Sequence, residues 1–330
     1  MNPKILEQLE VITLEEQEVL EGKREINKEL YMDSASTVVD QRKLLDKGKL
    51  IKIRTHTRFV HFPKHTHNYV EVIYMCKGKT GHVINGEEVI LREGELLFLN
   101  QNATQEIMPA EAEDIAVNFI ILPEFFDQSL LMIGDEENLI RDFIIGCIKG
   151  EEEKVSYLHF KVKDVLPIQN LIENLIWTIM NSQQNKRQIN QNTMGLLILH
   201  LMNHTDKVTV GKNQRDQEVI LSVYRYVEEQ YKDGKLSELA KELHYDLYSL
   251  SRMIKKITGK TYTELVQNKR LGQAAYLLNN TTLTVADVGL AVGYDNLSYF
   301  HRIFKEKYKV SPKKYRDSTI KYEVANKDTI

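Results

Sequence analysis

The sequence predicts an α+β protein of several domains: a β-barrel near the N-terminus, a helical linker, and an all-α C-terminal domain with two helix-turn-helix units. Three observations predict this order. Short apolar runs separated by Asn and Gly lie between residues 51 and 125, a long apolar stripe of helical period follows near residue 170, and the last hundred residues contain a repeat. A chain of 330 residues is also longer than one ordinary core requires, so at least two domains are expected.

Charge is distributed unevenly along the chain. Residues 217–318 carry 17 Lys and Arg against 12 Asp and Glu, a net +5, which leaves -8 for the rest because the whole chain carries -3. A basic C-terminal segment on an acidic body is typical of a protein in which one domain contacts phosphates. The two cysteines, Cys76 and Cys147, have no metal or redox spacing. With neither a signal-peptide pattern nor an apolar run long enough for a bilayer, the sequence predicts a cytoplasmic protein.

Residues 51–125 have the pattern of a small barrel. Six apolar runs of strand length alternate with turn signals, and Asn85-Gly86 is the strongest of these because both positions of a tight hairpin turn need positive φ. Several short strands at this spacing are typical of a barrel or a sandwich. Residues 1–50 are charged and only weakly periodic, and we expect them to form a helical N-terminal extension outside the core.

Residues 126–210 are predicted to form a helical linker. Apolar residues from Ile168 to Met180 recur at helical spacing and make one stripe. We expect this stripe either to dimerise with a second copy, which we favour, or to pack against the chain's own barrel. The polar stretch Thr205–Asp216 is the best candidate for a connection to the last domain.

The last domain, residues 217–318, contains two related copies of one pattern. Leu239–Asp246 matches Val288–Asp295 at an offset of 49, and Leu250–Lys256 matches Phe300–Glu306 at an offset of 50. Each copy has a short helix, a turn and a longer basic helix, which is the helix-turn-helix plan. The two units are expected at residues 236–259 and 284–309.

The turns and caps of the two units agree with this plan. Gly293 lies at the end of the second unit's first helix, where a left-handed residue is needed. His244 takes that place in the first unit, at a higher conformational cost. Thr284 and Asp287 approximate a capping box for the second unit's first helix.

The longer helix of each unit has an apolar face and a polar face. The side chains expected to point inward are Leu247, Leu250, Ile254 and Ile257 in the first unit, and Leu297, Phe300, Ile303, Phe304 and Tyr308 in the second. The side chains left outward, which we predict to contact DNA, are Tyr248, Ser249, Ser251, Arg252, Lys255, Lys256, Asn296, Ser298, Tyr299, His301, Arg302 and Lys305. Arg, Asn and Ser near a helix N-terminus suit base edges, and Lys further along suits phosphates.

The segment TVADVGLAVGYDNLSYFHRIFKEKYKVSPKKYR (Thr284–Arg316) resembles the signature of the AraC/XylS family of transcription regulators, and the likeness extends over about residues 217–318. Two positions depart from the family pattern: Gly289 stands where Ala is usual, and Lys309 where Gly is usual. The resemblance implies that both units contact one face of the duplex, in major grooves about one turn apart. It also implies RNA polymerase as a partner and activation as the more frequent outcome.

A second motif lies in the barrel segment. His65, His67 and Glu71, followed by Gly78, have the spacing HxHx3Ex6G, which resembles the first motif of the cupin fold. Cupin-like barrels are common sensors in AraC-type regulators, so the resemblance implies an effector-sensing barrel. At the place of the fourth ligand, where His is expected, this chain has Gln105.

Three interpretations of this motif stay open. His65, His67, Glu71 and Gln105 could ligate a divalent metal. They could instead line a metal-free pocket for a polar effector such as a sugar, or be packed core residues of a fold that no longer binds anything. The candidates for effector binding are Arg54, His56, Arg58, His65, His67, Glu71 and Tyr74. For Arg54, His56 and Arg58, which alternate along the first strand, the alternative is that they face solvent.

The leading hypothesis is a homodimeric, sequence-specific DNA-binding regulator whose barrel senses a small molecule related to carbohydrate. The alternative is a cupin-type metal-dependent enzyme, an isomerase or a dioxygenase, with an accessory helical domain. Gln105 makes a complete catalytic metal site less favourable, and no phosphate loop or nucleophile motif is present elsewhere in the sequence. We therefore predict no catalytic residue.

Overall fold

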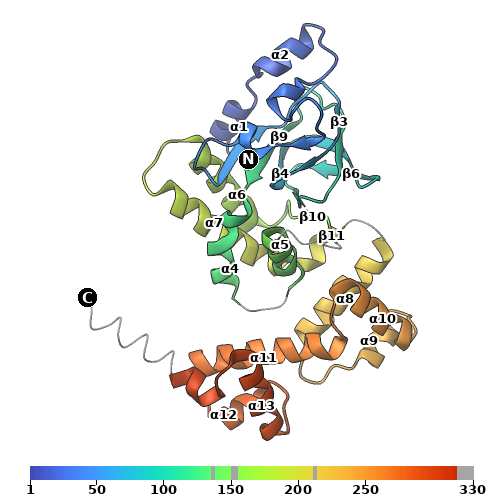
Figure 1. Ribbon diagram of the computed structural model, residues 1–330, viewed down its shortest axis with the longest axis vertical. Helices are drawn as coiled ribbons and strands as arrows, with labels where there is room; N and C mark the ends of the chain where they lie inside the picture. Colours follow the sequence, from blue (N-terminus) through green and yellow to red (C-terminus); the bar gives the residue numbers. More distant parts are fainter. Residues whose placement is uncertain (135–137, 150–154, 211–213, 318–330) are drawn as a thin grey trace. The chain divides into compact units, whose positions relative to one another are not determined.

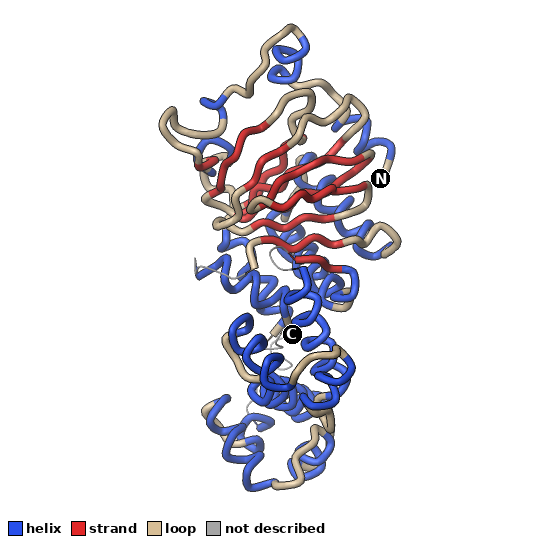
Figure 2. Tube along the Cα trace, turned by 90° about the vertical axis from the view of Figure 1, so that its right-hand side faces the viewer, coloured by secondary structure: helices blue, strands red, loops and turns tan. Residues whose placement is uncertain are grey.

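The computed structural model of the chain describes residues 1–134, 138–149, 155–210 and 214–317 (Figure 1). It divides into two compact units. The first unit contains residues 1–134 and 138–218, and the second begins at Val219. Figure 2 shows the strands confined to the first unit, whereas the second consists of helices and loops. No helix in the described ranges is long and apolar enough to cross a membrane.

Two sheets form the barrel of the first unit. The first has the strand order β11-β10-β7-β4-β9-β2, with bounds β2 Ile51–Thr55, β4 Val70–Lys77, β7 Leu96–Leu99, β9 Ile115–Ile121, β10 Tyr157–Phe160 and β11 Val208–Val210. The second has the order β1-β3-β8-β5-β6, with bounds β1 Val38–Val39, β3 Phe62–His67, β5 Lys79–Ile84, β6 Glu87–Arg92 and β8 Gln105–Ile107. Ile73, Leu91 and Leu97 are buried in one cluster of the barrel core, which the alternation of apolar side chains along the strands supplies.

The hairpin predicted at Asn85-Gly86 is confirmed. β5 and β6 pair antiparallel up to Ile84 and Glu87, and the two turn residues have φ of 51° and 86°. Asn tolerates the left-handed region and Gly adopts it without strain, so this dipeptide sets the register of both strands.

The N-terminal residues are part of the core, so the expectation of an extension outside it is wrong. This segment contains α1 (Pro3–Leu9), α2 (Leu14–Leu20), η1 (Lys28–Leu30), β1 and α3 (Gln41–Leu44). β1 pairs parallel with β3, and Ile26, Tyr31 and Met32 are buried against barrel residues. The segment lacks a regular apolar period because its buried residues come from turns and short elements.

The helical region after the barrel also packs on it. Its helices are η2 (Pro123–Phe126), α4 (Asp127–Ile133), α5 (Leu139–Lys149), α6 (Leu166–Met180), α7 (Lys186–Met202) and η3 (Thr205–Lys207). Ile168, Ile172, Leu175 and Ile176 of α6 are at most 1% exposed within their own chain. The apolar stripe is therefore unavailable to a second copy, and of the two expectations the packing against the chain's own barrel is the one that holds.

Two strands in this region were not expected. β10 pairs with β7 on one side and with β11 on the other, which extends the first sheet. β11 lies inside Thr205–Asp216, so the expectation that this whole stretch is a linker is wrong for Val208–Val210. Residues 211–213 of that stretch lie outside the described residues.

The second compact unit of the chain contains both of the predicted helix-turn-helix units. Its helices are α8 (Gln214–Gln230), α9 (Leu236–Glu242), α10 (Leu247–Thr258), α11 (Tyr262–Asn280), α12 (Val285–Ala291) and α13 (Leu297–Tyr308). Leu239, Leu250 and Ile254 belong to one core cluster, and Val288 and Phe300 to another. α11 contributes side chains to both clusters, so it is the element that the two helix-turn-helix units share.

Candidate nucleic-acid interface and barrel cavity

The longer helices of the two units, α10 and α13, each start at a side-chain cap. Asp246 accepts a hydrogen bond from the backbone N–H of Ser249 at 2.9 Å, and Asn296 accepts one from that of Tyr299 at 2.9 Å. These caps satisfy helix N–H groups that would otherwise lack a partner, and they fix where each helix begins. The Asn296 oxygen is therefore engaged within the chain, while its amide N–H groups remain for a ligand.

Buried apolar residues hold α10 and α13 from one side. Leu250 and Ile254 of α10, and Phe300 and Phe304 of α13, are fully buried, as the sequence predicts. Leu247 is 39% exposed, so the expectation that it points inward is wrong. It is the first residue of α10, where the helix has not yet reached the core.

The twelve side chains predicted to contact DNA lie on α10, on α13 or at the cap of α13. Ten are exposed, and only Ser249 and Ser251 are partly buried. Arg302 lies over the ring of Tyr299, with its guanidinium carbon 5.1 Å from the ring centre, and is 3.7 Å from Glu306. These contacts orient Arg302 without burying it. Both helices thus present to solvent a polar face that includes basic side chains.

The turns of the two units differ in conformational cost. His244 and Gly293 occupy the same place and both have positive φ, 56° and 91°. A Cβ at position 293 would lie 2.9 Å from the backbone oxygen of Lys232, so this position requires Gly. Lys309 follows α13 with φ of 63°, which is the conformation for which Gly is usual.

Gly289, the other departure from the family pattern, has a packing explanation. A Cβ at this position would lie 2.8 Å from Cδ2 of Leu297 and 3.1 Å from Cδ1 of Phe300. The start of α13 approaches α12 so closely that an Ala would push these side chains aside. The missing methyl group is therefore matched by larger side chains on the facing helix.

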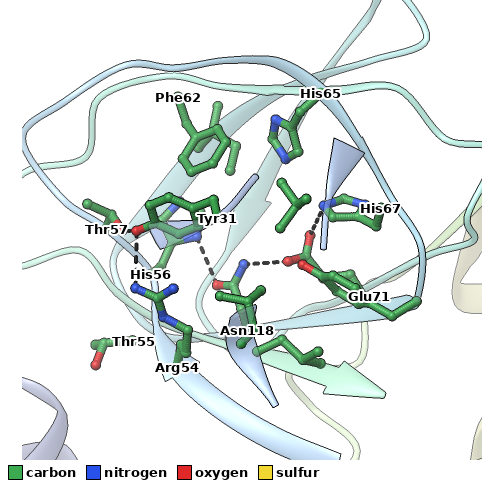
Figure 3. A pocket seen from close by; sticks show the side chains of 15 residues that line it. Tyr31, Arg54, Thr55, His56, Thr57, Phe62, His65, His67, Glu71 and Asn118 are labelled. Carbon is green, nitrogen blue, oxygen red and sulfur yellow. Dashed lines mark hydrogen bonds and ion pairs between the residues drawn. The ribbon is translucent and has the colours of Figure 1, made fainter. Parts of the chain in front are cut away.

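The barrel contains a cavity of about 50 Å³ (Figure 3). Its lining residues are Tyr31, Val39, Leu44, Arg54, Thr55, His56, Thr57, Phe62, His65, His67, Tyr69, Glu71, Ile107, Asn118 and Ile120. Five of the seven predicted effector residues are among them. A cavity of this size has room for only a few ordered waters.

Arg58 and Tyr74 do not line the cavity, so the expectation for these two residues is wrong. Arg58 is buried elsewhere, with Nε 2.7 Å from Oε1 of Glu16. The Tyr74 hydroxyl donates to Oε1 of Gln169 at 2.6 Å, which directs Tyr74 toward α6. The sequence analysis also missed lining residues such as Tyr31, because no periodic signal links its segment to the barrel.

A chain of polar side chains crosses the cavity. The Nδ1 of His56 is 3.0 Å from Oδ1 of Asn118, and Nδ2 of Asn118 donates to Oε1 of Glu71 at 2.9 Å. Oε2 of Glu71 lies 3.5 Å from Nε2 of His67 (Figure 3). Because Nδ1 of His56 faces an amide oxygen, it carries the hydrogen, and its Nε2 is left as an acceptor. That Nε2, Nδ1 of His67 and Oε2 of Glu71 are buried without a hydrogen-bond partner.

Burial disfavours the charged forms of the ionisable groups in this cavity. Desolvation lowers the pKa of His65 to about 4 and that of His67 to about 3, and it raises the pKa of Glu71. Arg54 supplies the positive charge at the edge of the cavity, where its guanidinium donates to the Tyr31 hydroxyl at 3.1 Å. The cavity therefore presents hydrogen-bonding groups whose charged forms are disfavoured by burial, with one cation beside them.

The described residues show no preformed metal site at the cupin-like motif. Among the described residues, no three His, Cys, Asp or Glu side chains are arranged to hold a metal ion. Nδ1 of His65 is 2.8 Å from the backbone oxygen of Pro63, and Nε2 of Gln105 is 3.1 Å from Nδ1 of His82. One nitrogen of His65 and the amide nitrogen of Gln105 thus face partners within the protein, whereas Nδ1 of His67 and Oε2 of Glu71 have none.

Comparison with known proteins identifies both units. Residues 48–196 match the model of the AraC-like ligand binding domain, and residues 239–318 match that of a helix-turn-helix domain. The chain belongs to the AraC/XylS family of transcription regulators.

Two curated relatives of this AraC/XylS-family protein come from Mannheimia succiniciproducens. The HTH-type transcriptional activator RhaS is 23% identical over 256 residues, which is 77% of this chain and 89% of that protein. The HTH-type transcriptional activator RhaR is 24% identical over 263 residues, covering 79% and 89%. Among solved structures, the C-terminal domain of AraT, a response regulator from Geobacillus stearothermophilus, is 32% identical, covers 32% of this chain and 88% of its own, and has a TM-score of 0.30.

The family settles the class of function. This AraC/XylS-family protein is a DNA-binding transcription regulator with an effector-sensing N-terminal domain. The regulatory relatives favour this function over the cupin-type isomerase or dioxygenase that the sequence left as an alternative.

Proposed function

We propose that the protein activates transcription by placing α10 and α13 in successive major grooves of one DNA face. The observation that carries this proposal is the pair of helices whose apolar faces are buried and whose polar faces are exposed. Arg252 and Arg302 lie on those polar faces and suit guanine edges, whereas Lys255 and Lys305 suit phosphates. The two helices differ in sequence, so an asymmetric half-site is expected.

Genome-wide affinity sequencing with the purified full-length protein tests this proposal. It should recover one motif with two unlike blocks about one helical turn apart. Footprinting on that motif should protect two grooves per protomer. A single protected groove, or enrichment without a common motif, would contradict the proposal.

For the effector, we infer a small, uncharged polar molecule such as a sugar in the barrel cavity. The buried acceptor and donor atoms of His56, His67 and Glu71 lack partners within the chain, and hydroxyl groups can both donate to and accept from them. Because burial disfavours the charged forms of these groups, the cavity favours an uncharged ligand. Since the cavity holds only a few waters, a sugar requires its covering residues Tyr31 and Val39 to move.

A thermal-shift panel on the full-length protein distinguishes ligand classes. Neutral sugars and sugar alcohols are compared with the corresponding sugar acids at equal concentration. A ligand present at 100 times its Kd should stabilise the first unit by about 2.7 kcal/mol. Stabilisation by the acids alone would contradict an uncharged effector.

We further propose that the regulator acts in the cytoplasm as a homodimer that contacts RNA polymerase. Doubling the DNA contacts raises affinity through effective concentration. Trp177 of α6 and Ile189 and Leu196 of α7 are 41%, 40% and 45% exposed, and the last two share one helix face because they are seven residues apart. Sedimentation of Ile189→Glu/Leu196→Glu should give a monomer. If the wild-type protein and the double variant were both dimers, this surface would not be the dimer interface.

A further inference from the structure

A second and larger cavity lies on the outside of the barrel, within the first unit. It has a volume of about 510 Å³. It runs beside β2, the last strand of its sheet, and its other lining residues come from α1, α6, α7, η2 and the loop before β2. Ligand sites in proteins commonly have volumes of about 300–1,000 Å³, so this cavity has the size of a metabolite site.

The inner walls of this cavity are apolar. Leu9 of α1 and Phe125 of η2 are buried, and Ile51 of β2 and Ile179 and Met180 of α6 continue the same surface. Water against these apolar side chains gains little from hydrogen bonding. The cavity therefore favours an occupant with an apolar body.

The mouth of the cavity carries positive charge that the chain does not neutralise. Lys49 and Arg187 are exposed there, and neither has an ion-pair partner among the described residues. Asp46, also in the lining, pairs with Lys52 at 3.0 Å and so is unavailable to them. An anion at this mouth would meet two cations that have no competing carboxylate.

Lys186 adds a third positive charge beside them. Its Nζ donates to the backbone oxygens of Ile179 and Asn181, at 2.7 and 3.2 Å, at the end of α6. Desolvation lowers the pKa of Lys186, and repulsion from Lys49 lowers it further. A bound anion would relieve this repulsion.

A buried amide in the wall points to a hydrogen-bonding group on the occupant. Asn190 of α7 lines the cavity and is 2% exposed, and its Oδ1 has no hydrogen-bond partner. An unsatisfied buried carbonyl oxygen costs about 1–3 kcal/mol, and a hydroxyl or N–H donor on a ligand removes that cost.

We propose that this cavity is a second small-molecule site, which takes an organic anion with an apolar body and a hydrogen-bond donor. The apolar walls hold the body, Lys49 and Arg187 hold the anionic group, and Asn190 accepts from the donor. The site is separate from the barrel cavity but adjoins it, since Arg54 and Thr55 of β2 border both.

Fluorescence titration of the full-length protein with anilinonaphthalene sulfonate tests the proposal. This probe has an aromatic body, an N–H donor and a sulfonate. Its uncharged counterpart phenylnaphthylamine has the same body without the sulfonate. The proposal expects saturable binding of the sulfonate at one site, with weaker binding of the neutral probe.

Matched variants locate the binding. Lys49→Gln/Arg187→Gln should weaken sulfonate binding by about tenfold and leave the neutral probe unchanged, because two exposed charge contacts are lost. Lys64→Gln/Lys79→Gln removes the same charge from exposed barrel residues outside both cavities and should leave both probes within about twofold of wild type. Met180→Trp should block both probes by filling the cavity, and circular dichroism checks that each variant is folded.

Three outcomes would overturn the proposal: no saturable binding to the wild-type protein, equal weakening by the two charge-matched pairs, or unchanged binding in a folded Met180→Trp protein. If an Asn190→Leu variant binds the sulfonate as tightly as the wild type, the Asn190 amide does not accept a hydrogen bond from the ligand. Loss of binding in Lys49→Gln/Arg187→Gln alone, with the neutral probe unaffected, supports it.

Discussion

The buried ion pair between Glu16 and Arg58 allows the stability of the first unit to be perturbed at one point. Their side chains are 0% and 2% exposed. Arg58 donates from Nε, from a terminal nitrogen and from its backbone N–H to the Glu16 carboxylate, at 2.7, 3.0 and 3.1 Å. The pair joins α2 to the barrel across 42 residues of sequence, so a Glu16→Gln substitution tests how firmly the N-terminal segment is held.

The magnitude follows from what the substitution leaves behind. Removing one charge of a buried pair costs about 3–5 kcal/mol, because the other charge stays buried without compensation. Gln keeps one acceptor oxygen for Arg58, so we expect the lower end, about 3 kcal/mol. The matched variant Glu16→Leu/Arg58→Met removes both charges and should cost less than Glu16→Gln, even though the backbone oxygen of Ala112 loses the hydrogen bond from Arg58.

The assay is urea unfolding of the full-length protein followed by tryptophan fluorescence. Trp177 is the only tryptophan and lies on α6 in the first unit, so the signal reports that unit alone. The free energy of unfolding comes from linear extrapolation. A loss below about 1 kcal/mol in Glu16→Gln would refute the argument, as would a double variant less stable than the single one.

The same pair sets a pH dependence. Burial raises the pKa of Glu16, but hydrogen bonds from the Arg58 side chain and from the backbone of Thr13 and Arg58 outweigh it, so the pKa lies below its ordinary value of 4.5. A depressed folded pKa gives stability that is present above the unfolded pKa and lost as the pH falls through the folded pKa. Wild-type stability should therefore decline below about pH 4.5, and Glu16→Gln should decline less.

Further predictions concern both units. Arg252→Ala should weaken binding to the cognate site by roughly 1–3 kcal/mol and relax base preference. Lys255→Ala should weaken binding to all sequences evenly and lower the dependence of log K on log salt by about one. Anisotropy titrations on cognate and scrambled duplexes distinguish the two effects, and equal behaviour of the two variants would refute the distinction. His244→Gly should stabilise the C-terminal compact unit by about 1 kcal/mol, because the φ of 56° at His244 is strained. Amide hydrogen exchange in that compact unit should become slower, and unchanged or faster exchange would contradict the prediction. Gly272→Ala should add about 1 kcal/mol to α11, since a Cβ there meets no atom within 4 Å; a lower melting temperature would contradict this. Glu71→Gln should remove the thermal shift that an effector gives and leave DNA affinity without effector unchanged; a retained shift would place the effector elsewhere.

Features that depend on neighbouring residues could be predicted from the sequence. The hairpin at Asn85-Gly86 requires only two residues able to adopt positive φ, and the φ angles of these two residues are 51° and 86°. Leu250 and Phe300 occupy matching places in the two repeats, and both are fully buried. In these cases the spacing along the chain already states which side chains share a face.

Features that depend on distant partners could not be predicted. Alternation with His56 predicted that Arg58 enters the barrel cavity, but β2 ends at Thr55, and the partner of Arg58, Glu16, belongs to a segment without any periodic signal. Tyr31 enters the cavity from the same segment and carries the Arg54 contact at 3.1 Å. Burial of a charged or polar side chain is decided by the partner it meets, and the partner is a property of the fold.

The short strands β10 and β11 were missed for a related reason. They have four and three residues, too few for alternation to stand out from a helical background. Their hydrogen bonds are long-range: Leu158 pairs with Phe98 of β7 on one side and with Val210 on the other. β10 forms a strand because it pairs with β7, which lies some sixty residues away in the sequence.

The shared helix α11 explains how two unequal readers can act on one duplex. Leu265 and Val266 near its start belong to the first core cluster, and Leu271 and Leu278 further along belong to the second. Its 19 residues give a rise of about 28 Å, which is close to the ~34 Å that separates successive major-groove faces. In the DNA complex that we propose, the length of α11 and the cores at its two ends set the spacing of the two recognition helices, and the exposed faces of α10 and α13 set base preference. Sequence differences between the copies can then change what is read without changing where it is read.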